Sequence, residues 1–218
     1  MKPKNLLSPV LSLLFPPRCP FCRRVLPVGE MICEACSEKL PQVTYRKYTV
    51  GNYPCCAPLP YRDTYAAAVK RFKFSRKRTY AQPLGLLVIA AAKRAYHDLS
   101  RFDCVTCVPM HKTTMRRRRF NQAELLAREC AALAGLPYRD TLMKVRQNAP
   151  QHTLKRDQRA ENVRGVFAVS DPSLVRGKRV LLIDDIITTG NTLGECAHML
   201  HDSGCREVCC AVVCATRS

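Results

Sequence analysis

Two adjacent carboxylates, Asp184 and Asp185, are the clearest candidates for chemistry in this chain. They precede a short loop rich in hydroxyl and backbone N–H groups, made of Thr188, Thr189, Gly190, Asn191 and Thr192. Backbone N–H groups at the start of a helix form a site for a phosphate dianion. Two acids beside such a site would repel the ligand unless they accept hydrogen bonds from vicinal hydroxyls or help to hold a hard divalent cation. A sugar phosphate with free cis-hydroxyls satisfies both halves of this pattern.

The elements around the loop predict how the two acids are positioned. Residues 180–183 are a continuous apolar run, Val-Leu-Leu-Ile, which is typical of a parallel strand buried on both faces. After the loop, apolar residues recur at helical spacing, at Leu193, Cys196, Ala197 and Leu200. Residues 208–215 form a second run of the buried-strand type. Since ligands of open α/β sheets bind beyond the carboxyl ends of the strands, we expect a site at the loop.

Elsewhere the apolar patterns predict alternating helices and strands, which favours an α/β fold with a mostly parallel sheet flanked by helices. Helices are expected at residues 64–74, 84–96 and 121–134, and strands at residues 103–110, 138–145 and 166–169. Asn121 and Glu124 have the spacing of a capping box at the start of the last of these helices. The basic segment 111–120 is expected to be a loop.

Four cysteines near the N-terminus form two C-x-x-C pairs with ten residues between them, Cys19 and Cys22, then Cys33 and Cys36. Two such pairs supply four thiolates for tetrahedral zinc, although the intervening length is shorter than usual. A module of this size cannot hold a core alone, so zinc binding would supply its folding free energy. A disulfide or redox pair, and plain core packing, are the alternative interpretations.

The other cysteines are expected mostly in the core of the protein, among a total of 14. Cys104 and Cys107 are predicted on opposite faces of a strand, where they would act as small hydrophobic residues. Cys55 and Cys56 are adjacent, which is poor geometry for chelation, and their ligation of a metal is left open. Because a nucleotide-type α/β domain is normally cytosolic and cytosolic thiols stay reduced, we expect a cytoplasmic protein.

The length of 218 residues is enough for one domain of ordinary size and a small module. We predict a module at residues 1–58, with a short amphipathic helix before its cysteines, and a second domain at residues 59–218. A targeting or membrane-surface role is the alternative for that helix. The formal net charge of +19 predicts attraction to polyanions, whether a phosphorylated ligand, nucleic acid or an acidic membrane surface. No apolar run is long enough for a transmembrane helix.

Several motifs together carry a resemblance to a known family. Four apolar residues, two acids and T-T-G-x-T closely resemble the phosphoribosyl-pyrophosphate (PRPP) motif of type I phosphoribosyltransferases. Residues 117–123 read R-R-R-F-N-Q-A, and residues 151–167 carry Q-x-x-L-x-x-x-x-R-x-x-N-V-x-G-x-F. With the paired C-x-x-C motifs, this combination resembles the ComF family of competence-associated proteins over nearly the whole chain. The resemblance implies a type I phosphoribosyltransferase fold and an N-terminal zinc module. It also implies a link to DNA uptake in naturally transformable bacteria, or a housekeeping role elsewhere.

The resemblance also implies roles for single residues. Asp184 and Asp185 would bind the ribose hydroxyls, residues 188–192 would hold the 5′-phosphate, and Mg²⁺ would bridge the pyrophosphate and the ribose. The basic segment Arg116–Arg119, which includes the candidate site residues Arg117 and Arg118, resembles the mobile loop that covers the pyrophosphate. Lys73 falls at a family K-F or K-Y position and would contact the same group. One departure is Arg119, which stands where the family commonly has a glycine and puts the loop conformation in doubt.

Two main function hypotheses follow from these patterns. The first is PRPP binding, with or without displacement of pyrophosphate at C1′ by a nitrogen nucleophile. The second is a non-catalytic factor on the same fold that binds single-stranded DNA or a DNA-uptake helicase. For this role, basic runs around Phe72, Phe74 and Phe120 would combine backbone neutralisation with base stacking. The alternative for each run is a solvated basic face whose phenylalanines pack in the core. A third hypothesis, a redox-sensing thiol protein, rests on the number of cysteines alone.

Overall fold

A computed structural model gives the structure of the chain over residues 16–41, 46–74, 78–118, 120–146 and 162–216. For Arg46, Lys112, Arg117 and Arg118 only the backbone is described. The expected helix before the cysteines lies outside the described residues, as do Arg119 and most of the segment 151–165.

The core of the fold is a six-stranded sheet in the order β1-β2-β8-β7-β4, with β3 also paired to β8. Its strands are β1 (Arg46–Val50), β2 (Tyr53–Ala57), β3 (Leu59–Pro60), β4 (Cys104–Cys107), β7 (Arg179–Ile187) and β8 (Glu207–Ala215). The β1–β2 pair is antiparallel, and the pairs β2–β8, β3–β8, β7–β8 and β4–β7 are parallel. This is the predicted α/β architecture with a mostly parallel sheet.

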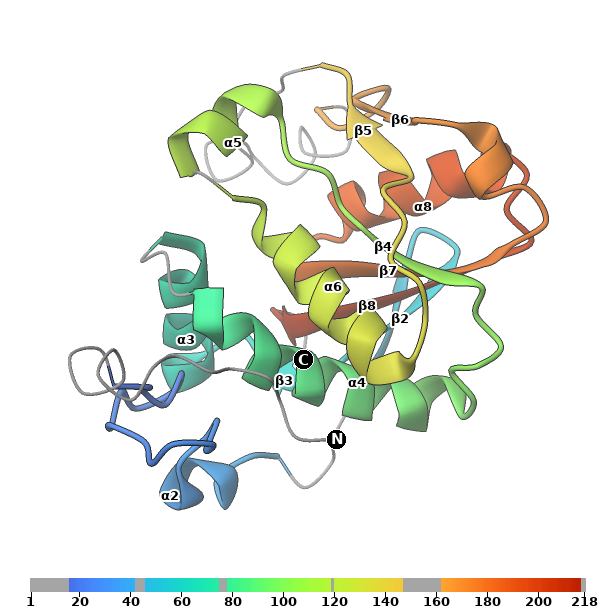
Figure 1. The fold of residues 1–218 in the computed structure, drawn as a ribbon. Coiled ribbons are helices and arrows are strands. Elements are labelled where there is room, and N and C mark those ends of the chain that lie inside the picture. The colour runs from blue at the N-terminus through green and yellow to red at the C-terminus, as the bar shows by residue number, and fades with distance from the viewer. Residues whose placement is uncertain (1–15, 42–45, 75–77, 119, 147–161, 217–218) are drawn as a thin grey trace.

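Helices cover both faces of the sheet (Figure 1). They are α2 (Glu34–Ser37), α3 (Asp63–Phe74), α4 (Ala81–Tyr96), α5 (Lys112–Arg118), α6 (Gln122–Ala134) and α8 (Asn191–Asp202), with 3₁₀ turns η1 (Arg78–Tyr80) and η3 (Pro172–Leu174). Leu181 and Ile183 of β7 pack with α4 and α6, whereas Val180 and Leu182 pack with α8. The continuous apolar run of β7 is therefore explained by burial on both faces.

The two thiols of β4 confirm the strand assignment there. Cys104 belongs to the core on the α8 side of the sheet, and Cys107 belongs to the core on the α4 and α6 side. Residues three apart in a strand point to opposite faces. Both thiols are buried, as expected for core packing.

Two sequence expectations were wrong. The basic segment expected to be a loop contains α5, whose start is stabilised by the Thr113 N–H, which donates to His111 Nδ1 at 3.3 Å. The strand expected at residues 138–145 is only β5 (Leu142–Lys144), which pairs antiparallel with β6 (Phe167–Val169) in a separate two-stranded sheet. Tyr138 instead makes an isolated parallel bridge with Val105 of β4, so a single run of sequence is divided between two sheets.

The predicted boundary after residue 58 falls between β2 and β3, and strands on both sides of it pair with β8. Residues 46–57 therefore contribute a hairpin to the main sheet, next to the segment that carries the four clustered cysteines. Within the described ranges, no helix is long and apolar enough to cross a membrane.

Candidate functional site

A cavity of about 480 Å³ opens at the carboxyl ends of β7 and β4. The carboxyl end of β7, the start of α8, the start of α6 and the last turn of α3 all contribute to its wall. Seven of the residues predicted for the site line it, namely Lys73, Asp184, Asp185, Thr188, Gly190, Asn191 and Thr192. Thr189 belongs to the same loop but is not among the lining residues. The side chains of Arg117 and Arg118 lie outside the described part of the structure.

The two acids differ in their surroundings. Asp185 is buried, and its Oδ1 lies 2.9 Å from the Lys73 Nζ. Asp184 is half-buried, and its Oδ1 accepts a hydrogen bond from the Asp185 N–H at 2.8 Å. Burial raises the pKa of Asp184 to about 7, and the neighbouring Asp185 adds to this effect, while Lys73 opposes it. Near neutral pH, Asp184 can therefore take up or release a proton.

The loop after the acids depends on Gly190. Its φ of +84° lies in the left-handed region that favours glycine, and an added Cβ would lie 3.0 Å from the Val50 Cγ1 of β1. Gly190 occupies the N-cap of α8 without any side-chain hydrogen bond to the helix. Asn191, Thr192 and Leu193 from the first turn of α8 line the cavity. This turn supplies N–H groups and the positive end of the helix dipole, which favour a phosphate.

Lys73 reaches the site from the last turn of α3. The Gln122 Nε2 at the start of α6 donates to the Lys73 carbonyl oxygen at 2.9 Å. Asn121, the N-cap of α6, accepts a hydrogen bond from the Ala123 N–H at 3.1 Å, which confirms the predicted cap. In the described part of the chain, the Glu124 carboxylate accepts a hydrogen bond from the Arg128 Nε at 3.0 Å rather than completing the predicted capping box. The ends of α3 and α6 thus meet at the edge of the cavity.

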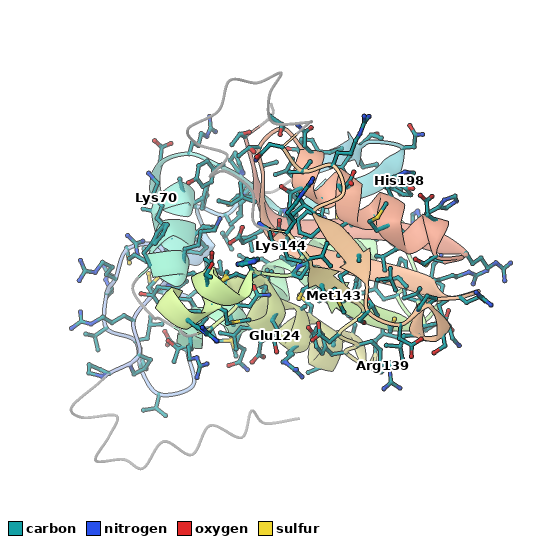
Figure 2. The ribbon with its side chains drawn as sticks, turned by 90° about the horizontal axis from the view of Figure 1, so that it is seen from above. Lys70, Glu124, Arg139, Met143, Lys144 and His198 are labelled. Atoms are coloured by element: carbon teal, nitrogen blue, oxygen red, sulfur yellow. The ribbon has the colours of Figure 1, made fainter. Side chains whose placement is uncertain are left out.

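Lys144 of β5 lines the cavity and was missed by the sequence reasoning. Burial lowers the pKa of Lys144, and its Nζ lies 5.7 Å from the centre of the Phe167 ring. Figure 2 shows Lys144 near the centre of the molecule, whereas Lys70 lies on the outer side of α3. Alternation along β5 puts Lys144 on the same face as the buried Leu142, and this was the available signal. The cavity therefore carries two lysines from separate elements.

The four clustered cysteines form a site that fits zinc. The Sγ atoms of Cys19, Cys22, Cys33 and Cys36 all lie within 4.8 Å of one another. A backbone hydrogen bond involving Arg24 lowers the pKa of Cys22 to about 7, so one ligand readily becomes the thiolate that a metal needs. Four sulfur donors with this spacing suit a tetrahedral structural zinc.

Cys55 and Cys56 lie in β2 of the main sheet, where both are buried. Among the described residues, the four-cysteine cluster is the one group found with metal-binding spacing, and it does not include this pair. All 14 cysteines are free thiols in the structure.

Of the three phenylalanines considered for base stacking, two are in the core. Phe72 is fully buried, and Phe120 is buried with the Arg78 guanidinium 5.3 Å from its ring centre. Phe74, at the end of α3, is 66% exposed. Phe74 is therefore the member of this set that a base could reach.

Comparison with known proteins gives two family matches. Residues 121–218 match the family described as "Phosphoribosyl transferase domain", and residues 10–58 match the "Double zinc ribbon domain". The first match covers the start of α6, the acids, the loop and β8. The second covers the four-cysteine cluster and supports a structural zinc.

Relatives that match about nine tenths of the chain are found among bacterial proteins. The "DNA utilization protein YhgH" of Salmonella typhi is 30% identical over 203 residues, which is 91% of this chain and 84% of that protein. The protein of the same name from Escherichia coli (strain K12) is 28% identical over 202 residues, with the same coverage. The "Competence protein F" of Haemophilus influenzae is 29% identical over 198 residues, which is 88% of this chain and 82% of that protein.

Proposed function

The chain belongs to the ComF family of competence-associated proteins, and from this premise we propose that its cavity binds PRPP together with Mg²⁺. The observation that carries the proposal is that the Asp184–Asp185 pair and the first turn of α8 line one cavity. An acidic pair and a helix N-terminus in one wall match the hydroxyl and phosphate ends of a phosphorylated ribose. The volume of about 480 Å³ falls within the range of small-molecule sites.

In the proposed complex, the two carboxylates accept hydrogen bonds from the ribose 2′- and 3′-hydroxyls. The loop of residues 188–192 holds the 5′-phosphate, and Gly190 allows its backbone to approach. Lys73, with Arg117 and Arg118 of α5, neutralises the pyrophosphate. Lys144 adds a second cation to the cavity wall.

Mg²⁺ would be held by the pyrophosphate oxygens with the carboxylate oxygens of the acidic pair, which are the hard ligands that it prefers. When bound, it supplies positive charge that stabilises the departing pyrophosphate. Asp185 is paired with Lys73 in the structure, so Asp184 has the more accessible carboxylate. Asp184 would therefore be the carboxylate better placed to hold the ion.

The reaction that such a complex supports is displacement at C1′. The bond between C1′ and the pyrophosphate oxygen breaks with its electron pair leaving on pyrophosphate, a bond from a nitrogen nucleophile forms, and the nitrogen loses a proton. Positively charged side chains placed around the leaving group stabilise the charge that develops there. Free thiols at all 14 cysteines suit the reducing cytoplasm, where we place this activity.

Titration calorimetry with PRPP and Mg²⁺ tests the proposal. Wild-type protein should bind, and the double variant Asp184→Asn/Asp185→Asn should not. Asp202→Asn, at the exposed far end of α8, serves as a matched control and should bind like the wild type. A folded, zinc-loaded wild-type protein that shows no binding at millimolar PRPP would overturn the proposal.

The second candidate is binding of single-stranded DNA, and it is favoured by the exposure of Phe74 beside basic residues of α3. An exposed aromatic ring stacks on bases, and nearby lysines and arginines neutralise the backbone. Fluorescence anisotropy with a labelled oligonucleotide should then show binding that weakens steeply with salt and is reduced in Phe74→Ala. A DNA-uptake helicase would be a partner of this surface rather than of the cavity.

A further inference from the structure

The last turn of α3 lies between the four-cysteine cluster and the cavity. On the side of the cluster, the Arg71 Nη2 donates to the carbonyl oxygens of Pro20 at 2.7 Å and Phe21 at 2.8 Å. Pro20 and Phe21 are the two residues between Cys19 and Cys22. Arg71 therefore binds the backbone of the first C-x-x-C turn directly.

A second contact joins the same helix to the cysteine-bearing segment. The Phe21 ring packs edge-on against Tyr65 of α3, with 5.5 Å between the ring centres and an angle of 89°. The Tyr65 hydroxyl donates to the Lys39 carbonyl oxygen at 2.7 Å, just beyond α2. Because α2 contains Cys36, α3 is attached near both C-x-x-C turns.

On the opposite side, the same turn of α3 reaches into the cavity. Residues two apart on a helix point in directions that differ by roughly 200°. Arg71 and Lys73 therefore leave the helix on opposite sides, and the fully buried Phe72 fixes the turn between them. The Lys73 ammonium contacts the Asp185 carboxylate, and the Lys73 carbonyl oxygen accepts a hydrogen bond from the Gln122 Nε2. One helical turn thus connects the cysteine cluster to the acidic pair.

We propose that Arg71 is a positioning residue which couples zinc occupancy to the placement of Lys73, and through it to the affinity of the cavity for PRPP. The inference rests on the proposed function, because it assigns a regulation to the same cavity. Arg71 does not line the cavity, so its effect would be transmitted through α3.

The charges explain why zinc would strengthen this connection. Four thiolates outweigh the positive charge of one zinc ion, so the loaded cluster is negative and attracts the Arg71 guanidinium. The Arg71 Nε is buried with no hydrogen-bond partner among the described residues, so the contacts of Nη2 and this attraction must offset its desolvation. Without zinc, the turn of Pro20 and Phe21 loses its constraint. Arg71 then loses two fixed acceptors, and the end of α3 is held less firmly.

Arg71→Met tests the coupling, with Lys70→Met as its matched control. Lys70 precedes Arg71 in α3 and is exposed (Figure 2). Lys70→Met therefore removes one positive charge, as Arg71→Met does. We expect Arg71→Met to retain one zinc per chain and to bind PRPP at least tenfold more weakly, and Lys70→Met to bind like the wild type. Equal PRPP affinities of zinc-loaded Arg71→Met and Lys70→Met would overturn the inference and leave the proposed function standing.

A second variant applies if Arg71→Met does not hold zinc. Tyr65→Phe keeps the ring against Phe21 and removes only the hydrogen bond to Lys39. It should weaken PRPP binding severalfold, and an affinity within twofold of the wild type would contradict the coupling.

Amide hydrogen exchange gives a readout that does not depend on PRPP. Removal of zinc from the wild-type protein should speed amide exchange in residues 70–74, and Arg71→Met should reduce the difference in exchange between the zinc-loaded and zinc-free states. If the wild type fails to bind PRPP, the proposed function is lost, but this measurement still decides the link between zinc and the end of α3. Unchanged exchange at residues 70–74 on zinc removal would exclude that link.

Discussion

The Lys73 ammonium lies 2.9 Å from the Oδ1 of Asp185, so a cation from α3 forms an ion pair with one of the two acids at the end of β7. Asp185 is buried, and an uncompensated carboxylate there would be costly. Lys73 therefore has two tasks in our interpretation, since it neutralises the acids in the free protein and contacts the pyrophosphate in the complex.

Replacement of Lys73 separates these tasks. Lys73→Met should weaken PRPP binding about 10- to 100-fold, which corresponds to the roughly 1.5–3 kcal/mol of a hydrogen bond to a charged group. It should also raise the pKa of Asp184 further, because Lys73 lowers that pKa in the wild type. Calorimetry between pH 6 and 9 would measure both effects. An unchanged affinity, with an unchanged pH profile, would exclude Lys73 from the site.

Asp184 makes stability depend on pH in a direction that follows from its environment. Its pKa is raised to about 7 in the fold, above the ordinary value of 3.8. The native state thus binds this proton more tightly than the unfolded chain does. The contribution of Asp184 to stability is therefore full below pH about 4 and is lost as the pH rises through about 7.

Asp184→Asn should consequently stabilise the free protein at pH 8 and have little effect at pH 4. Because the side chain is half-buried and partly screened by solvent, we expect on the order of 1 kcal/mol at pH 8, or roughly 2–4 °C in melting temperature. The same variant should lose PRPP affinity. Thermal melting without ligand, at both pH values, measures this trade-off, and a destabilised variant at pH 8 would contradict our account of Asp184.

The sequence predicts the parts of the site that are contiguous in the chain. The apolar run, the acids, the loop and α8 follow one another, so local patterns place Asp184 and Asp185 at the carboxyl end of a strand. The four cysteines are similarly predictable, because two short repeats supply all four ligands. In both cases the residues and their spacing define the chemistry without any long-range contact.

The rest of the site depends on contacts between distant segments. Lys144 enters the cavity wall because β5 and β6 pair apart from the main sheet, and the expected long strand concealed that arrangement. In the sequence, Arg71 is one residue of a basic run and nothing distinguishes it from its neighbours. The fold brings its guanidinium to the carbonyl groups of Pro20 and Phe21. The sequence left open whether Phe72 and Phe120 stack on bases or pack in the core, and the structure shows that both are buried.

Zinc binding gives a prediction on the cysteine cluster itself. The wild-type protein should carry one zinc per chain, and Cys33→Ser should lose it, because a serine hydroxyl replaces one of the four thiolates. Cys205→Ser is the matched control, since Cys205 is buried outside the cluster and donates to the Lys178 carbonyl oxygen at 2.9 Å, a contact that a hydroxyl can keep. Native mass spectrometry counts the metal, and zinc retained in full by Cys33→Ser would exclude the four-cysteine site.

Gly190 provides a test of the phosphate loop, with Gly135 as its internal control. Both have φ in the left-handed region, at +84° and +69°, so an alanine at either position strains the backbone by about 1 kcal/mol. An added Cβ at Gly135, which ends α6, meets nothing within 4 Å. At Gly190 it would lie 3.0 Å from the Val50 Cγ1 and displace the loop or the β1–β2 hairpin.

The free energy of unfolding of Gly190→Ala should therefore be about 1–3 kcal/mol lower than that of Gly135→Ala. Gly190→Ala should accordingly unfold at a lower denaturant concentration. It should also lose PRPP binding, because the first turn of α8 would no longer present its N–H groups at the same place. Gly135→Ala should bind PRPP like the wild type. Urea denaturation and calorimetry on the two variants measure these differences. If Gly190→Ala binds as tightly as Gly135→Ala, the 5′-phosphate does not rest on this loop.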